Sequence, residues 1–266
     1  MEIQEYIAEF VADWRLAGHS PATAETYARY IRHLTEFKDL PVTLQDVKRW
    51  LATSMSSESA RARARAVRAF GKWAEDHDGP EWTWWPQVPL TTVHQTPQPT
   101  ASHDDYVLAL QRARSLRDRL VIELLWSTGM RVSELARLTR DDVNLEERFA
   151  VVKQSKSGKP RLVPLSDAAC RLIRRVNSQS DSVLSMTSHA IQLMLRRIDA
   201  PSAHAWRRGW AVNSLRSGVS QTSVQAAGGW ASGAMVTRYT AAVSGELAIS
   251  EFRRRQDPAT PSHSAT

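Results

Sequence analysis

The chain has 266 residues, of which 42% are hydrophobic and 24% are charged, a balance typical of a globular protein with one large or two ordinary domains. Its net charge is +7, and 29 of its 35 basic residues are arginine. This excess favours a polyanionic partner such as nucleic acid, although a GC-rich genome would produce the same bias. Cys170 is the single cysteine, which excludes an intramolecular disulfide and a zinc site built on cysteines.

The sequence contains no signal for a membrane or for export. No window approaches 18 apolar residues, and no basic segment precedes an apolar run at the N-terminus. We therefore expect an intracellular protein of the bacterial cytoplasm.

The first 80 residues have the periodicity of four helices, which predicts a compact all-α domain. Ser20-Pro21 supplies an N-cap and a first helical residue, and Thr43 caps the third helix. The fourth helix is expected from Ser56 or Ser57 to about Asp76.

That fourth helix carries three arginines on one side, at i, i+4 and i+7: Arg61, Arg65 and Arg68. They are candidate contacts to DNA phosphates. A solvated charged face would give the same pattern.

Residues 81–102 are rich in proline and tryptophan, which predicts an interdomain linker whose tryptophans pack against one domain. Asp104 or Asp105 is expected to cap the next helix, and a strongly apolar helix follows over Leu116–Thr128. Two short strands, one around 149–152 and one over 161–165, form a hairpin in which Pro164 indicates an edge strand. Five helices are then expected near 167–177, 187–198, 203–216, 221–228 and 232–242, and a last short one over 246–255.

Residues 201–240 hold the groups needed to grip and attack a phosphate. His204 and Arg207 share a helix face, and Tyr239 follows Trp230 after nine residues. Cleavage of a phosphodiester needs a nucleophile, an acid for the leaving oxygen, and donors for the charged oxygens. Because no clustered carboxylates are present to hold magnesium, we expect chemistry without a metal or other cofactor, in which arginines supply the charge.

The order of these motifs resembles the tyrosine site-specific recombinases of the phage integrase family. The matching stretches cover most of the chain and are SPATAETYARYIRHL, STGMRVSELARLTRDDV, KSGKPRLVPL, HAWR, and GGW with a tyrosine nine residues later. The resemblance implies a mainly α fold, in which an N-terminal four-helix core-binding domain precedes an α-rich catalytic domain with a small antiparallel β-sheet. It divides the chain into a core-type, SAM-like DNA-binding domain (1–80), the linker (81–102), the catalytic domain (103–244) and a C-terminal tail (245–266).

The resemblance also implies roles for six residues. Tyr239 would attack the phosphate and form a 3′-phosphotyrosyl link, Arg131 and Arg207 would hold the non-bridging oxygens, and Lys156 would protonate the leaving 5′-oxygen. His204 would assist proton transfer, and Trp230 would donate its indole N–H to the phosphate. Glu134, three residues after Arg131 on the same face, would orient that guanidinium.

Several alternatives remain open from the sequence. His204 could be a core histidine, Trp230 a packing anchor and Tyr239 an ordinary tyrosine. Lys153 and Lys159 compete with Lys156 in one hairpin, and Arg208 follows Arg207 directly where the family commonly has histidine. Gly228-Gly229-Trp230 stands where the family commonly has Leu-Gly-His, and the extra glycine is expected to loosen the segment.

The implied function is strand exchange between two short DNA sites by a homo-tetramer, through a Holliday junction, most simply for phage DNA integration. The chain begins at the core-binding domain, so a simple site without distant arm-type sequences is expected. The tail could dock into a neighbouring subunit or pack in cis, with Leu247, Ile249 and Phe252 on its apolar face. A type IB topoisomerase or a non-catalytic DNA-binding regulator would share much of this pattern.

Chemistry that relies on arginines predicts that EDTA does not abolish DNA cleavage. The measurement is the yield of cleaved strand with and without the chelator, with a magnesium-dependent nuclease as the positive control. Cleavage that stops in EDTA and returns only with magnesium would contradict the arginine-based site.

Overall fold

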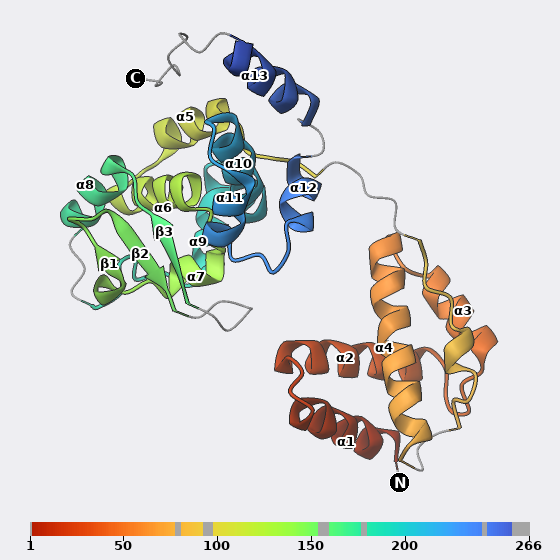
Figure 1. Ribbon diagram of the computed structural model, residues 1–266. Coiled ribbons are helices and arrows are strands. Elements are labelled where there is room, and N and C mark those ends of the chain that lie inside the picture. Colours follow the sequence, from red (N-terminus) through yellow and green to blue (C-terminus); the bar gives the residue numbers. More distant parts are fainter. Residues whose placement is uncertain are drawn as a thin grey trace. The chain divides into compact units, whose positions relative to one another are not determined.

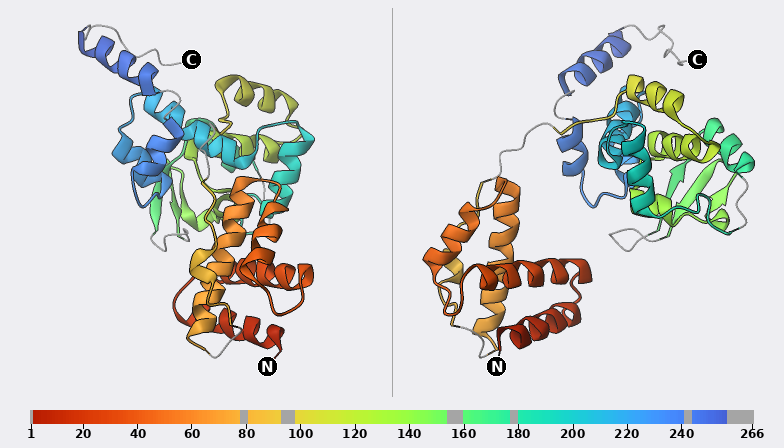
Figure 2. Two further views of the ribbon diagram at one scale, coloured as in Figure 1. Left: turned by 90° about the vertical axis from the view of Figure 1, so that its right-hand side faces the viewer. Right: turned by 180° about the vertical axis from the view of Figure 1, so that it is seen from behind.

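The computed structural model describes residues 2–77, 81–92, 98–153, 160–176, 180–240 and 244–256. The chain divides into two compact units, Met1–Thr96 and Pro97–Thr266, which are drawn from three directions in Figures 1 and 2. Within the described ranges, no helix has the length and apolarity to cross a membrane.

The first unit consists of helices, as the periodicity predicted. They are α1 (Ile3–Leu16), α2 (Pro21–Phe37), α3 (Leu44–Ala52), α4 (Ser57–Glu75) and a 3-10 helix, η1 (Trp85–Gln87). The starts of α3 and α4 are fixed by the hydroxyls of Thr43 and Ser56, which accept hydrogen bonds from N–H groups in the first turns. The helix order and the caps expected at Thr43 and Ser56 are therefore confirmed. Ser20 occupies the N-cap position of α2, before Pro21, but its side chain makes no capping hydrogen bond.

The core of the first unit forms where α4 packs against the other three helices. Phe70 of α4 meets Phe10 of α1 edge to face, with ring centroids 5.4 Å apart. Trp82, from the segment predicted as a linker, is 3% exposed and packs on Phe70 with centroids 5.0 Å apart. As expected, tryptophan from this segment packs against one domain.

The second unit surrounds α6 with helices and a small sheet. The helices that precede the sheet in the chain are α5 (His103–Arg112), α6 (Leu116–Thr128), α7 (Val132–Ala136) and the 3-10 helix η2 (Arg140–Asp142). The later helices are α8 (Asp167–Arg175), α9 (Ser188–Arg197), α10 (Ala203–Arg216), α11 (Gln221–Gly228), α12 (Ala234–Thr240) and α13 (Ser244–Gln256).

One cap and one strand differ from the sequence predictions. Ser102, not Asp104 or Asp105, caps α5, because its hydroxyl accepts from the Asp105 N–H while the Asp105 carboxylate binds back to Ser102. The sheet contains three strands, β1 (Val143–Asn144), β2 (Phe149–Val152) and β3 (Arg161–Pro164), in the order β1-β2-β3. A two-residue strand such as β1 leaves no alternating pattern to detect.

The β2–β3 pair is antiparallel, with Val152 opposite Arg161 and Phe149 opposite Pro164. Because β3 is an edge strand, the position inferred from Pro164 is confirmed. The turn predicted between the strands lies outside the described residues. Helices α10, α11 and α12 lie together, and β3 is the strand nearest to them (Figures 1 and 2).

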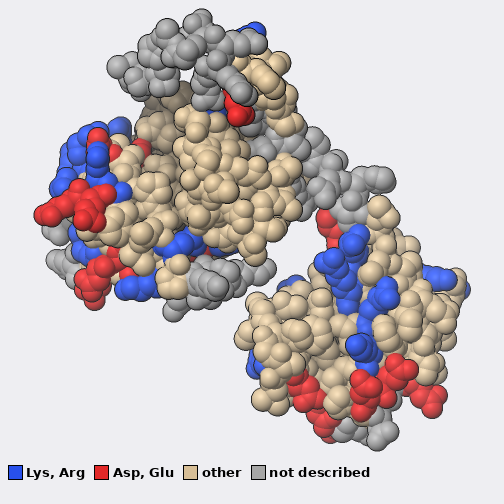
Figure 3. Space-filling view, in the orientation of Figure 1, with Lys and Arg blue, Asp and Glu red and all other residues tan. Residues whose placement is uncertain are grey.

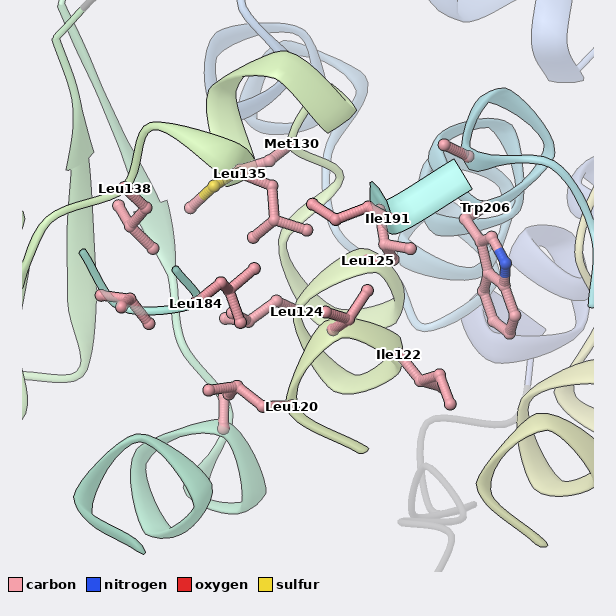
Figure 4. Close-up of a cluster of buried hydrophobic side chains, with 14 of the residues drawn as sticks. Leu120, Ile122, Leu124, Leu125, Met130, Leu135, Leu138, Leu184, Ile191 and Trp206 are labelled. Atoms are coloured by element: carbon pink, nitrogen blue, oxygen red, sulfur yellow. The ribbon is translucent and has the colours of Figure 1, made fainter. Parts of the chain in front are cut away.

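Helix α6 is buried on nearly every side. Leu120, Ile122, Leu124 and Leu125 are all fully buried in the cluster shown in Figure 4. The same helix buries a carboxylate, Glu123, which accepts a hydrogen bond from the Tyr106 hydroxyl at 2.6 Å. A helix surrounded in this way is a rigid support for the residues that follow its C-terminus.

Candidate active site

The chain reverses direction at the end of α6 and brings Arg131 to the start of α7. Gly129 ends α6 with φ = 61°, in the left-handed region. A Cβ at this glycine would lie 2.2 Å from the Trp210 ring of α10, so only glycine fits. The tight turn leaves the Gly129 carbonyl available to accept a bond from Arg207 and makes Arg131 the N-cap residue of α7.

Glu134 on α7 holds Arg131 in place. Its carboxylate accepts from the Arg131 guanidinium at 2.7 Å and from the Arg131 backbone N–H at 2.8 Å. The same carboxylate accepts two bonds from Arg161, at 3.0 and 2.6 Å. Burial raises the pKa of Glu134, but the hydrogen bonds from Arg161 and Arg131 outweigh it and lower the pKa to about 2. Glu134 therefore contacts both the backbone and the side chain of Arg131.

Arg207 is buried on α10, with 4% of its surface exposed. Its two terminal nitrogens donate to the carbonyls of Gly129 and Gly228, and its guanidinium lies 4.4 Å from the centroid of the Trp230 ring. Burial and the nearby charge of Arg131 lower the pKa of Arg207 to about 9, so the group remains a cation at neutral pH. Since a guanidinium has five N–H groups, three remain after these two bonds.

Trp230 connects Arg207 to Tyr239. Its ring meets the Tyr239 ring edge to face, with centroids 5.6 Å apart. Both residues belong to a small apolar cluster with Trp210. A Cβ on Gly228 would lie 2.2 Å from the Trp230 ring, so the glycine gives room for the indole. The expectation of a loosened segment stays a prediction.

His204 and Arg208 also lie on α10, around Arg207. Partial burial, followed by the charges of Arg208, Arg207 and Arg131, lowers the pKa of His204. Its imidazole is therefore neutral at pH 7 and can accept a proton. Arg208 donates through Nε to the Pro99 carbonyl at 2.7 Å, which fastens the segment before α5. This bond and the burial of Arg207 favour Arg207 over Arg208 as the second phosphate-binding arginine.

The hairpin carries three candidate lysines, Lys153, Lys156 and Lys159. Lys156, like Lys159, lies outside the described residues. Lys153 is described, and its ammonium binds the Asp142 carboxylate at 2.6 Å. Because that pairing occupies Lys153, the structure leaves Lys156 and Lys159 as the candidate acids.

The three arginines proposed for DNA contact lie on α4 in the first unit. Figure 3 shows basic side chains in a stripe along this helix. Arg61 donates to the Thr91 carbonyl at 3.0 Å, and Arg68 lies 5.9 Å from the centroid of the Trp85 ring, whereas Arg65 is exposed. Two of the three therefore also fasten the segment that follows α4.

Arg161 is the residue near the site that the sequence analysis missed. It was assigned only to a strand, yet its side chain is 7% exposed and it binds Glu134. The sequence did contain a signal for Arg161, because it is a charged residue at the start of an edge strand, beside the hairpin that carries the lysines. Its partner could not be predicted from the sequence, because Glu134 is 27 residues earlier in the chain.

The mainly α fold with a small antiparallel sheet is the fold of the tyrosine site-specific recombinases. A family model described as the phage integrase family matches residues 102–245, and the chain belongs to that family. It is thus an enzyme of the tyrosine recombinase class.

The matched proteins agree with this placement. Tyrosine recombinase XerA of Thermococcus kodakarensis is 26% identical over 280 residues, which cover 97% of this chain and 96% of XerA. A Tn1549 transposon integrase in complex with circular intermediate DNA has a similar fold, with a TM-score of 0.71 and 18% identity over 96% of this chain and 99% of that chain. A lambda integrase dimer bound to a COC′ core site has a TM-score of 0.72 and 17% identity, over 90% and 95% of the two chains.

Substitution Gly228→Ala is expected to lower the rate of strand cleavage by about tenfold or more. The added Cβ must displace the Trp230 indole and, with it, the carbonyl that holds Arg207, and overpacking of this kind costs about 1–3 kcal/mol. Single-turnover cleavage measures the effect. Gly245→Ala is the matched control, because a Cβ there meets nothing within 4 Å. Equal rates for both variants would contradict this packing argument.

Proposed function

We propose that this protein recombines short duplex DNA sites through a covalent 3′-phosphotyrosyl intermediate. The observation that carries the proposal is the convergence of side chains from separate parts of the chain. Arg207 lies over Trp230, Trp230 contacts Tyr239, and Arg131 is close enough for its charge to add to burial in lowering the pKa of Arg207. Two cations, an indole donor and a phenol around one point fit a phosphodiester under attack.

In the proposed reaction, the Tyr239 oxygen forms a bond to phosphorus and the bond to the 5′-oxygen breaks. The neutral imidazole of His204 takes the phenol proton, and Lys156 gives a proton to the departing 5′-oxygen. Arg131 and Arg207 stabilise the negative charge on the non-bridging oxygens, and Trp230 donates its N–H to one of them. Because the energy of the broken phosphodiester bond is kept in the new phosphotyrosyl bond, a 5′-hydroxyl from a second site can reverse the step without ATP.

We further propose that the two units bind duplex DNA together. The solved lambda and Tn1549 integrases are both in complex with DNA, and the arginines on α4 supply a basic surface in the first unit. The first unit corresponds to the core-binding domain, and the second to the catalytic domain. The boundaries at 80, 102 and 244 remain part of this proposal.

A homo-tetramer that exchanges strands through a Holliday junction is the proposed assembly. On α13, Ile249 is 55% exposed and Phe252 is 64% exposed, which suits docking into a neighbouring subunit. The side chain of Leu247 lies outside the described residues. Phage integration in a bacterial cytoplasm is the proposed setting, and chromosome-dimer resolution or transposon movement would use the same chemistry.

The central test is whether Tyr239 forms a covalent adduct with DNA. A pool of nicked duplexes with randomised sequence is incubated with the protein, and SDS-resistant protein–DNA complexes are recovered and sequenced. We expect adducts that share one DNA site, and none with Tyr239→Phe, which keeps the ring but lacks the nucleophile. A wild-type protein that leaves no adduct would refute the catalytic proposal and favour a DNA-binding regulator. Relaxed plasmid without recombinants between two copies of the site would favour a topoisomerase.

Substitution Lys156→Ala is expected to slow cleavage by about 10²- to 10⁴-fold, the range for loss of a general acid. A substrate with sulfur at the 5′-bridging position should recover most of that rate, because a thiolate leaves without protonation. Lys153→Ala is the control, since Lys153 is paired with Asp142 and should show no such sulfur-specific recovery. If Lys159→Ala alone shows the recovery, Lys159 is the acid in place of Lys156.

A further inference from the structure

Arg161 uses its guanidinium to connect two segments that are distant in the sequence. Two terminal nitrogens bind the two oxygens of Glu134, at 3.0 and 2.6 Å. The third donor, Nε, binds the Ala227 carbonyl at 2.7 Å. The side chain is 7% exposed, and that of Glu134 is 1% exposed, so this network is almost removed from water.

Each of those two segments fixes the position of one of the arginines proposed to bind the phosphate. Glu134 fixes Arg131 through a side-chain bond and a backbone bond. Ala227 precedes Gly228, whose carbonyl accepts from Arg207. Arg161 therefore connects the support of Arg131 to one of the two carbonyl supports of Arg207, the other being Gly129 in the turn before Arg131.

The network also contains the strand that leaves the lysine-bearing hairpin. Arg161 is the first residue of β3 and pairs with Val152 at the end of β2. Its side chain joins the base of the hairpin to α7 and to the end of α11. A fixed guanidinium can do this because its three donor directions lie in one plane, whereas a lysine has a single ammonium.

We propose that Arg161 is a positioning residue for DNA cleavage, which sets the separation of Arg131 and Arg207 by bonding both of their supports. The inference rests on the proposed function, because it assigns Arg161 to the same phosphate site. Arg161 does not contact the phosphate in this role. Its loss would remove one of the connections between the two arginines and leave the bond of Arg207 to the Gly129 carbonyl. The remaining connection would hold their separation less precisely, and a small misplacement of groups around a transition state lowers the rate more than it lowers binding.

The ionisation of Glu134 gives this role a distinct signature. In the wild type its pKa is about 2, so the carboxylate stays charged throughout pH 5–8 and adds no pH dependence there. Without Arg161, burial raises that pKa, and the opposing groups are the hydrogen bonds from Arg131 and the charge of Arg207. Lowering the pH then protonates Glu134 and releases Arg131, so the rate of the variant relative to wild type falls toward pH 5.

The experiment compares Arg161→Gln with wild type on the nicked duplex recovered by covalent capture. We expect single-turnover cleavage at saturating protein to fall at least about tenfold, while the apparent Kd for that duplex changes less than about threefold. The ratio of variant to wild-type rates should fall further between pH 8 and pH 5. Arg148→Gln is the matched control, because it removes an exposed arginine–carboxylate pair, with Asp167 at 2.6 Å, from the same unit.

Arg161→Lys keeps the charge and separates the two parts of the proposal, and it serves in place of Arg161→Gln if that variant does not fold. Its ammonium should keep Glu134 ionised, so the rate ratio stays flat with pH, but the rate itself should remain below wild type because one ammonium cannot replace three planar donors. A rate for Arg161→Gln equal to that of Arg148→Gln, a flat pH ratio for Arg161→Gln, or full activity for Arg161→Lys would each overturn the inference. These results are read only where wild type forms the adduct, so they are distinct from failure of the proposed function.

Discussion

The site depends on one buried carboxylate shared between two arginines. Glu134 is nearly inaccessible, and a lone charge at such a position would be strongly disfavoured. Arg131 and Arg161 together compensate that cost, and they do so with hydrogen bonds that fix their own orientations. Arg207 lies near both cations, and burial together with their repulsion lowers its pKa. Three arginines and one carboxylate leave the arrangement with a net positive charge. A site of this kind favours an anion at its centre, which a phosphate supplies.

Backbone carbonyls hold the second arginine instead of a carboxylate. Arg207 binds the carbonyl oxygens of Gly129 and Gly228, which are neutral acceptors and leave its charge uncompensated. Both glycines lie against tryptophan rings, and a Cβ at either would collide with one. The packing of Trp210 and Trp230 and the position of Arg207 are thus two consequences of the same backbone geometry. Local rigidity comes from α6, whose buried leucines anchor the turn at Gly129.

Much of the fold could be predicted from local patterns, because the apolar spacing and the cap residues of each element lie within its own stretch of sequence. The spacing of apolar residues predicted the four helices of the first unit, and Thr43 and Ser56 marked two helix starts. The predictions were wrong where an element was too short to show a pattern, or where neighbouring residues could each have served as the helix cap. Strand β1 has two residues, and at α5 the N-cap Ser102 stands close to the acidic residues Asp104 and Asp105.

The sequence by itself determined the candidate groups, their order and the class of chemistry, because those residue types recur in motifs that can be read along the chain. Glu134 could be paired with Arg131, since three residues separate them on one helix. Only the tertiary structure decided that Arg161 completes this pair, that Lys153 is taken by Asp142, and that Arg208 binds Pro99 while Arg207 turns inward. These contacts join residues up to 109 positions apart. No local periodicity encodes such distances, and packing of the helices around α6 brings the partners together.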